Sequence, residues 1–289
     1  MMGTDYLVST ALVLVAIGVL SGLTTVLFGF GGGFVAVPVV TWVHAQLGGT
    51  AVTVAIATSA AVMLVNAGVA TAATPRATLR QLRGSGWLLP TLALGGAVGA
   101  LIGGQLPGAV VRWAFLGYLA VTILDVLLRP GFLRPVAREP AQSDRRSGAG
   151  ARLGVPAAVG FPVGALAAAL GVGGSVMTVP LLRRSGARMA VAAALANPLT
   201  LVISAPALLV FVAQGAGVSG PVAPVPGIVG AVDLVAASAL LLGAVPVIVW
   251  LRRRPLRIPD RIHTIAYPGL LLIAGLAMLL APEVSPAQA

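Results

Sequence analysis

The stretch "GFGGGFVAVPVV", residues 29 to 40, places four glycines within five positions and then Pro38 in a chain otherwise dense with valine, leucine and alanine. Glycine weakens a helix, and proline inside a helix removes a backbone hydrogen bond. The apolar segment that follows these glycines, residues 33 to 47, is shorter than the roughly 20 residues that an ordinary helical membrane crossing needs. The stretch therefore predicts a deliberate break inside an apolar region.

The composition places that break in a membrane protein. Of the 289 residues, 58% are hydrophobic and only 9% are charged, and the mean hydropathy is +1.03. Soluble domains carry about a quarter charged residues. Residues 7 to 28 are uncharged over a length that spans a bilayer as a helix. We therefore expect an all-α integral membrane protein whose constant partner is the lipid bilayer.

Apolar segments alternate with polar or arginine-bearing loops along the whole chain. The segments fall at about 7 to 28, 33 to 47, 51 to 73, 87 to 106, 108 to 128, 153 to 170, 175 to 182, 189 to 212, 231 to 251 and 262 to 281. Two of them, 33 to 47 and 175 to 182, are too short for an ordinary crossing, and each follows a glycine cluster.

The second glycine cluster repeats the first about half a chain later. It reads "GVGGSVMTVPLL", residues 171 to 182, and a gap-free alignment pairs Gly29 with Gly171, Gly31 with Gly173, Gly32 with Gly174, Val37 with Val179 and Pro38 with Pro180. Downstream, "AVTVAIATS" (51 to 59) corresponds to "AVAAALANP" (190 to 198). We therefore expect two homologous transmembrane repeats, residues 1 to 128 and 153 to 289, joined by an arginine-rich linker at 129 to 152.

The arginines predict how the repeats are oriented. Seventeen of the 18 lie in loops 74 to 86, 129 to 152, 183 to 188 and 252 to 261, which we expect to be cytoplasmic. The N-terminus is then outside, and it lacks the basic region of a cleaved signal. Each half makes an odd number of passes, so the halves are inverted, with re-entrant or broken helices at the glycine turns. The expected location is a bacterial cytoplasmic (inner) membrane.

The helix starts after the glycine turns are candidate anion sites. A helix that begins inside the membrane leaves its first N–H groups without acceptors, and lipid cannot satisfy them. Those N–H groups and the positive end of the helix dipole favour an anion. Close helix packing is the alternative role for glycines in membranes, and their duplication beside two short segments favours the anion site. The candidate binding residues are Gly29, Gly31, Gly32, Gly33, Phe34, Thr58, Ser59, Gly171, Gly173, Gly174, Ser175 and Asn197.

Several ionisable residues lie near span ends. Asp125 and Asp233 could relay protons, but an interfacial, solvated or paired carboxylate is the preferred interpretation. His44 would suit pH sensing or simply end a helix, and His263 is expected to be solvated in a cytoplasmic loop. Arg112 could snorkel to the outer surface or attract anions there.

The sequence lacks the residue patterns that other classes of function would require. Cysteine is absent, and no His, Asp or Glu cluster has metal-ligand spacing, so we expect no metal and no cofactor. The glycine runs match neither nucleotide-binding pattern. The spans lack paired acid, base or nucleophile groups, which argues against an enzyme. No extended basic face is expected to bind nucleic acid, and homo-oligomerisation stays open.

The duplicated Gly-x-Gly-Gly-Gly with a spaced proline, together with "ATS" at residues 57 to 59, resembles the TauE/SafE family of sulfite exporters, also called TSUP permeases. The resemblance implies a polytopic permease for sulfite, sulfoacetate or related small anions, with the two glycine runs and Pro38 and Pro180 at the family's motif positions. Ser175, Val40 and the pair Asn197-Pro198 depart from the family pattern.

From these observations we predict a secondary transporter that exports a small anion by alternating access. By the resemblance, the anion is sulfite or a related sulfur oxyanion or organosulfonate. The alternatives are a transporter of small organic carboxylates and a non-transporting membrane partner subunit. The coupling ion and the identity of the anion stay open.

Overall fold

The computed structural model describes residues 2–84, 86–129, 132, 157–214, 227–254, 256 and 258–281, and describes only the backbone at 2–8, 83 and 84. Most of the predicted linker lies outside these ranges. The helices are α1 (Met2–Phe28), α2 (Gly33–Val43), α3 (Ala51–Ala72), α4 (Arg76–Leu79), α5 (Leu88–Gly103), α6 (Gly108–Leu128), α7 (Ala157–Ala169), α8 (Ser175–Arg184), α9 (Met189–Gln214), α10 (Leu234–Arg253) and α11 (Asp260–Leu280), with 3-10 turns η1 (Ala45–Thr50) and η2 (Arg80–Gly84).

The observed helices follow the predicted apolar segments. Within the described residues, six stretches are long and apolar enough to cross a membrane: Ser9–Phe28, Ala45–Ala72, Gly108–Leu128, Met189–Gln214, Leu234–Arg253 and Asp260–Leu280. The two segments predicted to be short form α2 and α8, of 11 and 10 residues. The chain is therefore a multi-pass α-helical membrane protein.

A short β-hairpin departs from the expected all-α fold. Strands β1 (Ile228–Val229) and β2 (Val232–Asp233) pair antiparallel, where the sequence analysis expected helix from residue 231. Gly227 and Gly230 both have positive φ, which favours a tight turn at this point. Asp233 then begins α10 by accepting hydrogen bonds from the amides of Val235 and Ala236. The hairpin therefore fixes where α10 starts.

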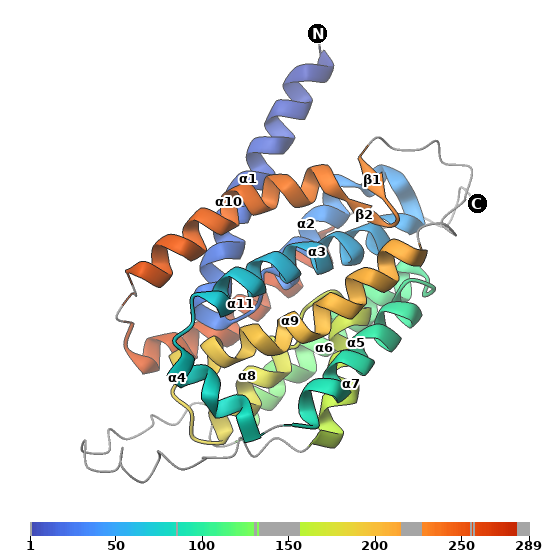
Figure 1. Ribbon diagram of the computed structural model, residues 1–289. Coiled ribbons are helices and arrows are strands. Elements are labelled where there is room, and N and C mark those ends of the chain that lie inside the picture. The colour runs from blue at the N-terminus through green and yellow to red at the C-terminus, as the bar shows by residue number, and fades with distance from the viewer. Residues whose placement is uncertain are drawn as a thin grey trace, which may run out of the picture.

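The first helix of each predicted repeat packs against a helix of the other repeat. Helices α1 and α10 lie side by side, as do α7 and α5 (Figure 1). Gly18 of α1 faces the backbone of Leu240, and Gly95 of α5 faces the backbone of Phe161, so closely that neither glycine could carry a Cβ. Small residues thus allow the close helix contacts that drive packing in membranes.

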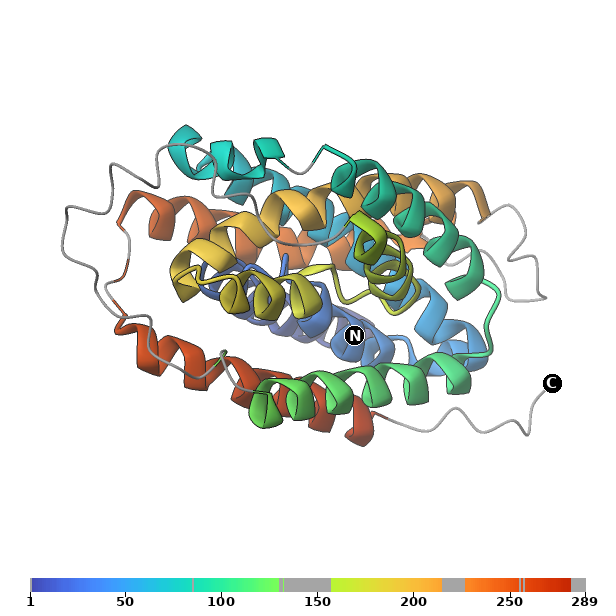
Figure 2. The ribbon, with the colours of Figure 1, turned by 90° about the horizontal axis from the view of Figure 1, so that it is seen from below.

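Helices α3 and α9 pack together with the short helices α2 and α8 beside them. Helices α6 and α11 pair with each other along one edge of the bundle (Figure 2). The glycine turns therefore lie among packed helices, whereas the α6–α11 pair lies at the periphery.

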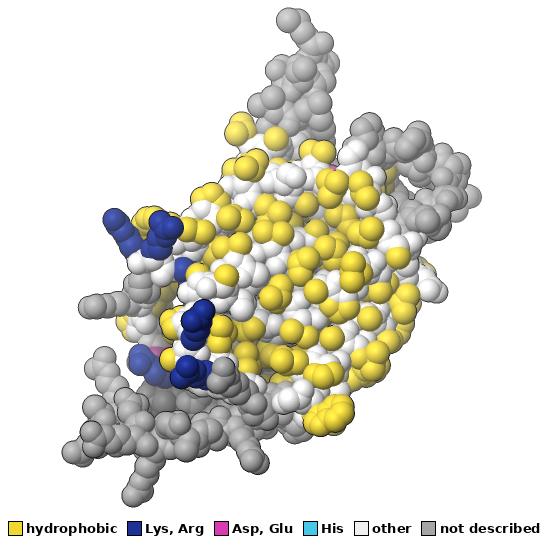
Figure 3. Space-filling model, in the orientation of Figure 1, with side chains coloured by type: hydrophobic (Ala, Val, Ile, Leu, Met, Phe, Trp, Pro, Cys, Tyr) yellow, Lys and Arg dark blue, Asp and Glu magenta, His cyan; other side chains and the backbone are white. Residues whose placement is uncertain are grey.

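The face of the bundle seen in Figure 3 is apolar except at one end. Figure 3 shows arginine side chains gathered at one end of the molecule and apolar side chains over the face between the ends. We call the two ends arginine-rich and arginine-poor. Trp42, Trp87, Trp113 and Trp250 are each more than half exposed. Exposed indoles suit the membrane interfaces, where their amphipathic rings are favoured.

Candidate functional site

The two glycine clusters form matching turns in the backbone. Gly29 and Gly171 have φ of 75° and 65°, and Gly31 and Gly173 have φ of 63° and 74°. Such positive φ values are strained for residues with a Cβ, so these positions require glycine. The match ends at the third pair, because Gly32 has φ of 86° whereas Gly174 is right-handed helical at φ −68°.

After each turn a helix begins whose first backbone N–H groups have no hydrogen-bond acceptor in the part of the chain that the structure describes. Helices α2 and α8, which we call the half-helices, begin at Gly33 and Ser175, within one residue of the predicted starts. Among the described residues, no acceptor faces the backbone N–H groups of residues 31 to 34 and 173 to 176. The two turns therefore present unpaired donors at the positive ends of two helices.

The two turns lie against each other in the protein interior. A Cβ built on Gly33 would lie 2.7 Å from the carbonyl oxygen of Gly171, and one on Gly173 would lie 3.3 Å from that of Phe30. The Met63 side chain of α3 lies between them and would contact a Cβ on either Gly33 or Gly173. All these residues are buried. The conformation therefore holds the turns closed on each other.

Buried hydroxyl groups surround the paired turns. The Cγ2 atom of Thr200 on α9 would contact a Cβ on either Gly31 or Gly173, so this residue touches both turns. Among the described residues, the buried hydroxyls of Ser175, Thr178 and Thr200 have no hydrogen-bond partner. A buried polar group without a partner is unfavourable. These hydroxyls are consequently available to a ligand.

Ser59 and Asn197 cross from one repeat to the turn of the other. The Ser59 hydroxyl donates to the Gly171 carbonyl oxygen at 3.0 Å. The Asn197 amide donates to the Thr25 carbonyl oxygen at 3.3 Å, four residues before Gly29. Thr58 lies elsewhere, since its hydroxyl oxygen accepts a 3.0 Å bond from the Asp233 amide at the arginine-poor end. Thus Ser59 bonds to a residue of a turn, whereas Asn197 bonds to the Thr25 carbonyl oxygen that also accepts from the Gly29 amide.

An aromatic cluster closes one side of the first turn. Phe34 is fully buried, and the centroid of its ring lies 4.3 Å from the centroid of the Phe30 ring. The Phe30 ring in turn contacts that of Tyr267 on α11. The Tyr267 hydroxyl donates to the Val176 carbonyl oxygen at 2.7 Å, in the first turn of α8. Phe34 therefore lies among aromatic rings that connect both half-helices to α11.

The prediction of a solvated His263 is wrong. This residue lies in the first turns of α11, is only 6% exposed, and its Nε2 contacts the Leu27 carbonyl oxygen at the end of α1. Its ring also meets that of Phe28 edge to face. The loop residues Asp260 and Arg261 suggested solvent, but α11 begins at Asp260, and its inward face buries His263.

Met63, Asn66 and Thr200 contact the turns and were missed by the sequence analysis. The Asn66 amide donates to the Gly31 carbonyl oxygen at 3.3 Å. Helical spacing could have found all three, because residues three, four or seven apart share a helix face. Met63 and Asn66 follow Ser59 at four and seven positions, and Thr200 follows Asn197 at three.

The far end of α2 is anchored by an ion pair at the arginine-poor end. His44 caps α2, and its Nε2 lies 2.9 Å from Oδ2 of Asp233 while its Nδ1 lies 3.1 Å from the Val40 carbonyl oxygen. The hydrogen bond with Asp233 raises the pKa of His44 above its usual value, against the effect of burial. Burial alone would raise the pKa of Asp233, but His44 and the α10 amides together hold it below its usual value. The preferred interpretation of Asp233 as a paired carboxylate is confirmed.

The far end of α8 is anchored by guanidinium groups at the arginine-rich end. Arg183 is 1% exposed, and its Nη2 lies 2.6 Å from Oδ2 of Asp260 on α11. Arg184 pairs with Asp125 of α6 at 2.5 Å, and Arg129 adds a 3.2 Å contact to the same carboxylate. Asp125 is thus a paired carboxylate, as expected. The two half-helices are therefore held at opposite ends by different chemistry.

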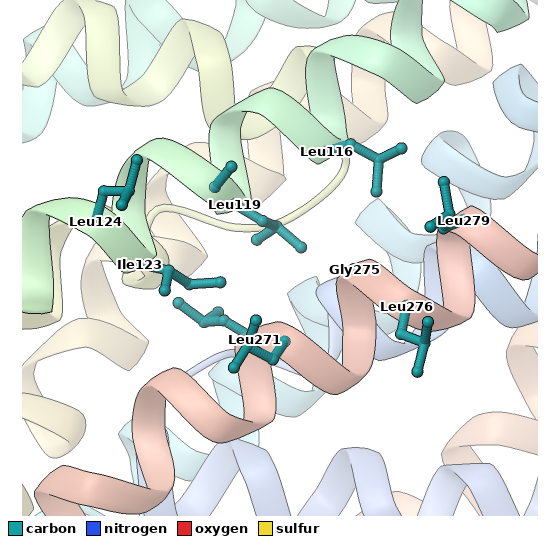
Figure 4. Close-up of a pocket in the computed structure, with 10 residues that line it drawn as sticks. Leu116, Leu119, Ile123, Leu124, Leu271, Gly275, Leu276 and Leu279 are labelled. Atoms are coloured by element: carbon teal, nitrogen blue, oxygen red, sulfur yellow. The ribbon is translucent and has the colours of Figure 1, made fainter.

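A lipid-facing groove is chemically unsuited to an anion. It encloses about 470 Å³ between α6 and α11 and is lined only by Leu, Ile, Ala and Gly residues, including Leu119, Leu271 and Gly275 (Figure 4). Apolar side chains cannot replace the hydration of a charged solute. An anion site is therefore better sought at the glycine turns.

Comparison with known proteins identifies the family. A model of the family described as "Sulfite exporter TauE/SafE" matches residues 14–278, which include both glycine turns and both half-helices. No curated protein and no solved structure matches the chain. Because the family match covers nearly the whole chain, this membrane protein belongs to the TauE/SafE sulfite exporter family of transporters.

Proposed function

We propose that the chain exports a small anion, sulfite or a related sulfur oxyanion or organosulfonate, and binds it between the two glycine turns. The observation that carries the proposal is the meeting of two helix starts whose N–H groups find no acceptor among the described residues. The family match supports export and the sulfur class of substrate. The binding residues proposed are those of the turns with Phe34, Ser59, Ser175, Asn197 and Thr200.

The free energy needed to desolvate an anion requires several hydrogen-bond donors to act together. One helix terminus stabilises a charge by about 0.3–1 kcal/mol, or up to ~2 kcal/mol when partly buried. Desolvating an anion costs far more than that. Each hydrogen bond to a charged group adds about 1.5–3 kcal/mol. The amides of both turns and the hydroxyls of Ser175 and Thr200 together supply a donor set of the required size without a buried cation.

The packing supports an inverted repeat with alternating access. Helix α2 runs from its turn to the start of α10, while α8 runs from its turn to the start of α11. Since α10 starts at the arginine-poor end and α11 at the arginine-rich end, the half-helices point in opposite directions. In the proposed cycle the turns part, Met63 moves aside, and each half-helix opens a path to its own side.

The orientation proposed follows the arginines. Arginine-rich loops are retained on the cytoplasmic side of bacterial inner membranes, so the arginine-poor end with His44 faces outward. Transport of a small organic carboxylate is the nearest alternative, because the same donors would accept a carboxylate. The family match disfavours a non-transporting partner subunit.

Removing the unpaired hydroxyls tests the site. We expect Thr200→Val and Ser175→Ala to lower sulfite flux in proteoliposomes by on the order of tenfold, since each loses a bond to a charged group. Their thermal stability should stay equal or rise, because these hydroxyls have no partner among the described residues. A flux panel of sulfite, sulfate, thiosulfate, sulfoacetate and acetate on the native protein identifies the substrate class.

Thr122→Val is the matched control. This buried hydroxyl donates to the Tyr118 carbonyl oxygen at 2.8 Å within α6 itself, so its loss should lower stability and leave flux unchanged. Full sulfite flux in both Thr200→Val and Ser175→Ala would overturn the proposed site. Faster transport of acetate than of sulfite by native protein would overturn the proposed substrate.

A further inference from the structure

We propose that His44 and Asp233 form a proton-operated latch that holds the half-helix α2 closed at the arginine-poor end and releases it when the shared proton leaves. The latch joins the residue that caps the end of α2 to the residue that caps the start of α10. It is a property of the fold, and it rests on the proposed function only for its effect on transport.

The geometry favours an additional proton shared by the two side chains. Nδ1 of His44 faces the Val40 carbonyl oxygen, which can only accept a hydrogen bond. Nε2 faces Oδ2 of Asp233, whose other oxygen already accepts two amide bonds. Both contacts are therefore satisfied only when the pair holds one proton more than a neutral imidazole and a carboxylate. A neutral imidazole has a single N–H, so loss of that proton leaves one of the two contacts without a hydrogen, and in either tautomer the ion pair with Asp233 loses its positive charge.

The surroundings provide no substitute charge. Helix α2, strand β1, turn η1 and helix α3 contain no other Asp, Glu, Arg or His, and α3 contributes only the hydroxyl of Thr58 to Asp233. Helix α11 also contacts α2, but its charged residues lie in its first turn at the arginine-rich end. Helix α1 packs along α10 with Gly18 beside Leu240, and its acidic residue Asp5 lies thirteen positions before Gly18, whereas Asp233 lies seven before Leu240. The arginines of α10 lie at its opposite end. On α6, which contacts η1, Arg112 donates to the Leu279 carbonyl oxygen of α11. Among the described residues, His44 and Asp233 thus depend on each other.

The opposite half-helix lacks this sensitivity. Arg183 holds α8 to Asp260 through a guanidinium group, and guanidinium groups keep their charge throughout the physiological pH range. Only α2 is therefore released by a rise in pH. With the proposed orientation, an acidic exterior keeps the outer path closed and an alkaline exterior frees it.

Cysteine labelling measures the latch without any transport. The chain contains no cysteine, so an introduced one is unique. Thr41 lies three residues before His44, is 4% exposed, and its hydroxyl has no partner among the described residues, so Thr41→Cys should fold. Gln46→Cys, at an exposed position of the same end, corrects for the effect of pH on thiol reactivity. The measurement is made in nanodiscs from pH 5.5 to 9. It gives the maleimide labelling rate of the Thr41→Cys variant divided by that of the Gln46→Cys variant.

The expected ratio rises with pH by on the order of tenfold, the effect of losing one charge-assisted hydrogen bond. In His44→Gln the side-chain amide donates to Asp233 at every pH, so the ratio should stay low and flat. In Asp233→Asn the imidazolium loses its anion while the amide oxygen still caps α10, so the rise should shrink. A flat ratio in the native background, or an equal rise in His44→Gln, would overturn the latch.

Flux measurements separate the latch from the proposed function. If the latch gates transport, sulfite flux rises with pH on the arginine-poor side, and His44→Gln abolishes that dependence. Labelling that follows pH in a protein that moves no sulfite would contradict the proposed substrate and leave the latch standing. Sulfite flux with pH-independent labelling would overturn the latch and leave the transporter standing.

Discussion

The two half-helices begin alike and end differently. Both start at a glycine turn with unpaired amides, yet α2 ends at His44 and Asp233 whereas α8 ends at Arg183 and Asp260. The shared start supplies the same chemistry twice, which an anion bound between the turns requires. The different ends give each half-helix its own condition for release. On the proposed function, the binding chemistry is therefore the same in both halves while the two gates differ.

The largest effect is expected at the shared starts. Gly173→Leu places a large side chain at φ of 74° beside Met63, and we expect sulfite flux to fall at least tenfold, since the turns could no longer meet. Gly173→Ala, a smaller change, should give a partial loss. Gly117→Leu is the matched control, because a Cβ at this exposed position meets nothing within 4 Å. Normal flux in well-folded Gly173→Leu protein would show that the turns play no part in transport.

Removing Arg183 breaks the permanent anchor of α8. In Arg183→Ala the carboxylate of Asp260 loses its 2.6 Å partner and Phe132 loses a donor to its carbonyl oxygen. Losing one partner of a buried ion pair costs about 3–5 kcal/mol. Thermal unfolding in detergent should register this as a large drop, well beyond that of His44→Ala. Equal losses in the two variants would remove the distinction between the two anchors.

The third position of the glycine turns sharpens the comparison further. A Cβ on Gly32 would combine positive φ with a direct clash against the Ser21 hydroxyl, whereas a Cβ on Gly174 would clash only with the flexible end of Ile203. Left-handed backbone costs about 1–2 kcal/mol and overpacking about 1–3 kcal/mol. Gly32→Ala should therefore lower the unfolding temperature clearly more than Gly174→Ala. The reverse order would mean that the two turns do not differ as described.

The smallest effect concerns pH and the stability of the His44 anchor. The raised pKa of His44 contributes stability that is fully present below the unfolded value near 6.5 and is lost as pH rises through the folded value. The lowered pKa of Asp233 contributes stability present above about 3.9 and lost as pH falls through its folded value.

The stability advantage of native protein over His44→Gln should therefore be greatest between about pH 4 and 6.5 and shrink above that, by about 1 kcal/mol. Unfolding temperatures measured in parallel from pH 5 to 9 give this difference directly. Arg183→Lys serves as the control, since its difference from native should not follow that profile. A stability difference between native protein and His44→Gln that grows with pH would contradict this prediction.

Sequence periodicity was enough to predict much of the fold. The alternation of apolar segments with arginine loops predicted the helices, and the repeated glycines predicted both turns and the starts of α2 and α8 to within one residue. These features depend on local composition and on glycine at positive φ. The hairpin before α10 was missed because two-residue strands leave no periodic signal, although Gly227 precedes it and Gly230 lies in its turn.

Contacts between distant segments were harder to predict. The pairing of His44 with Asp233 joins residues far apart in the chain, and it is seen only where the end of α2 meets the start of α10 in the folded protein. Similarly, Thr200 touches both turns because α9 lies beside α3 and α8, which no single segment encodes. His263 was assigned to solvent from its charged neighbours, whereas the ends of α1 and α11 bury it together.

A structure determined with bound sulfite tests the central claim most directly. We predict the anion between the two turns, within hydrogen-bond distance of amides from residues 31 to 34 and 173 to 176, with the Thr200 and Ser175 hydroxyls turned toward it and Met63 displaced. Sulfite bound elsewhere, with Met63 still wedged between Gly33 and Gly173, would contradict the account.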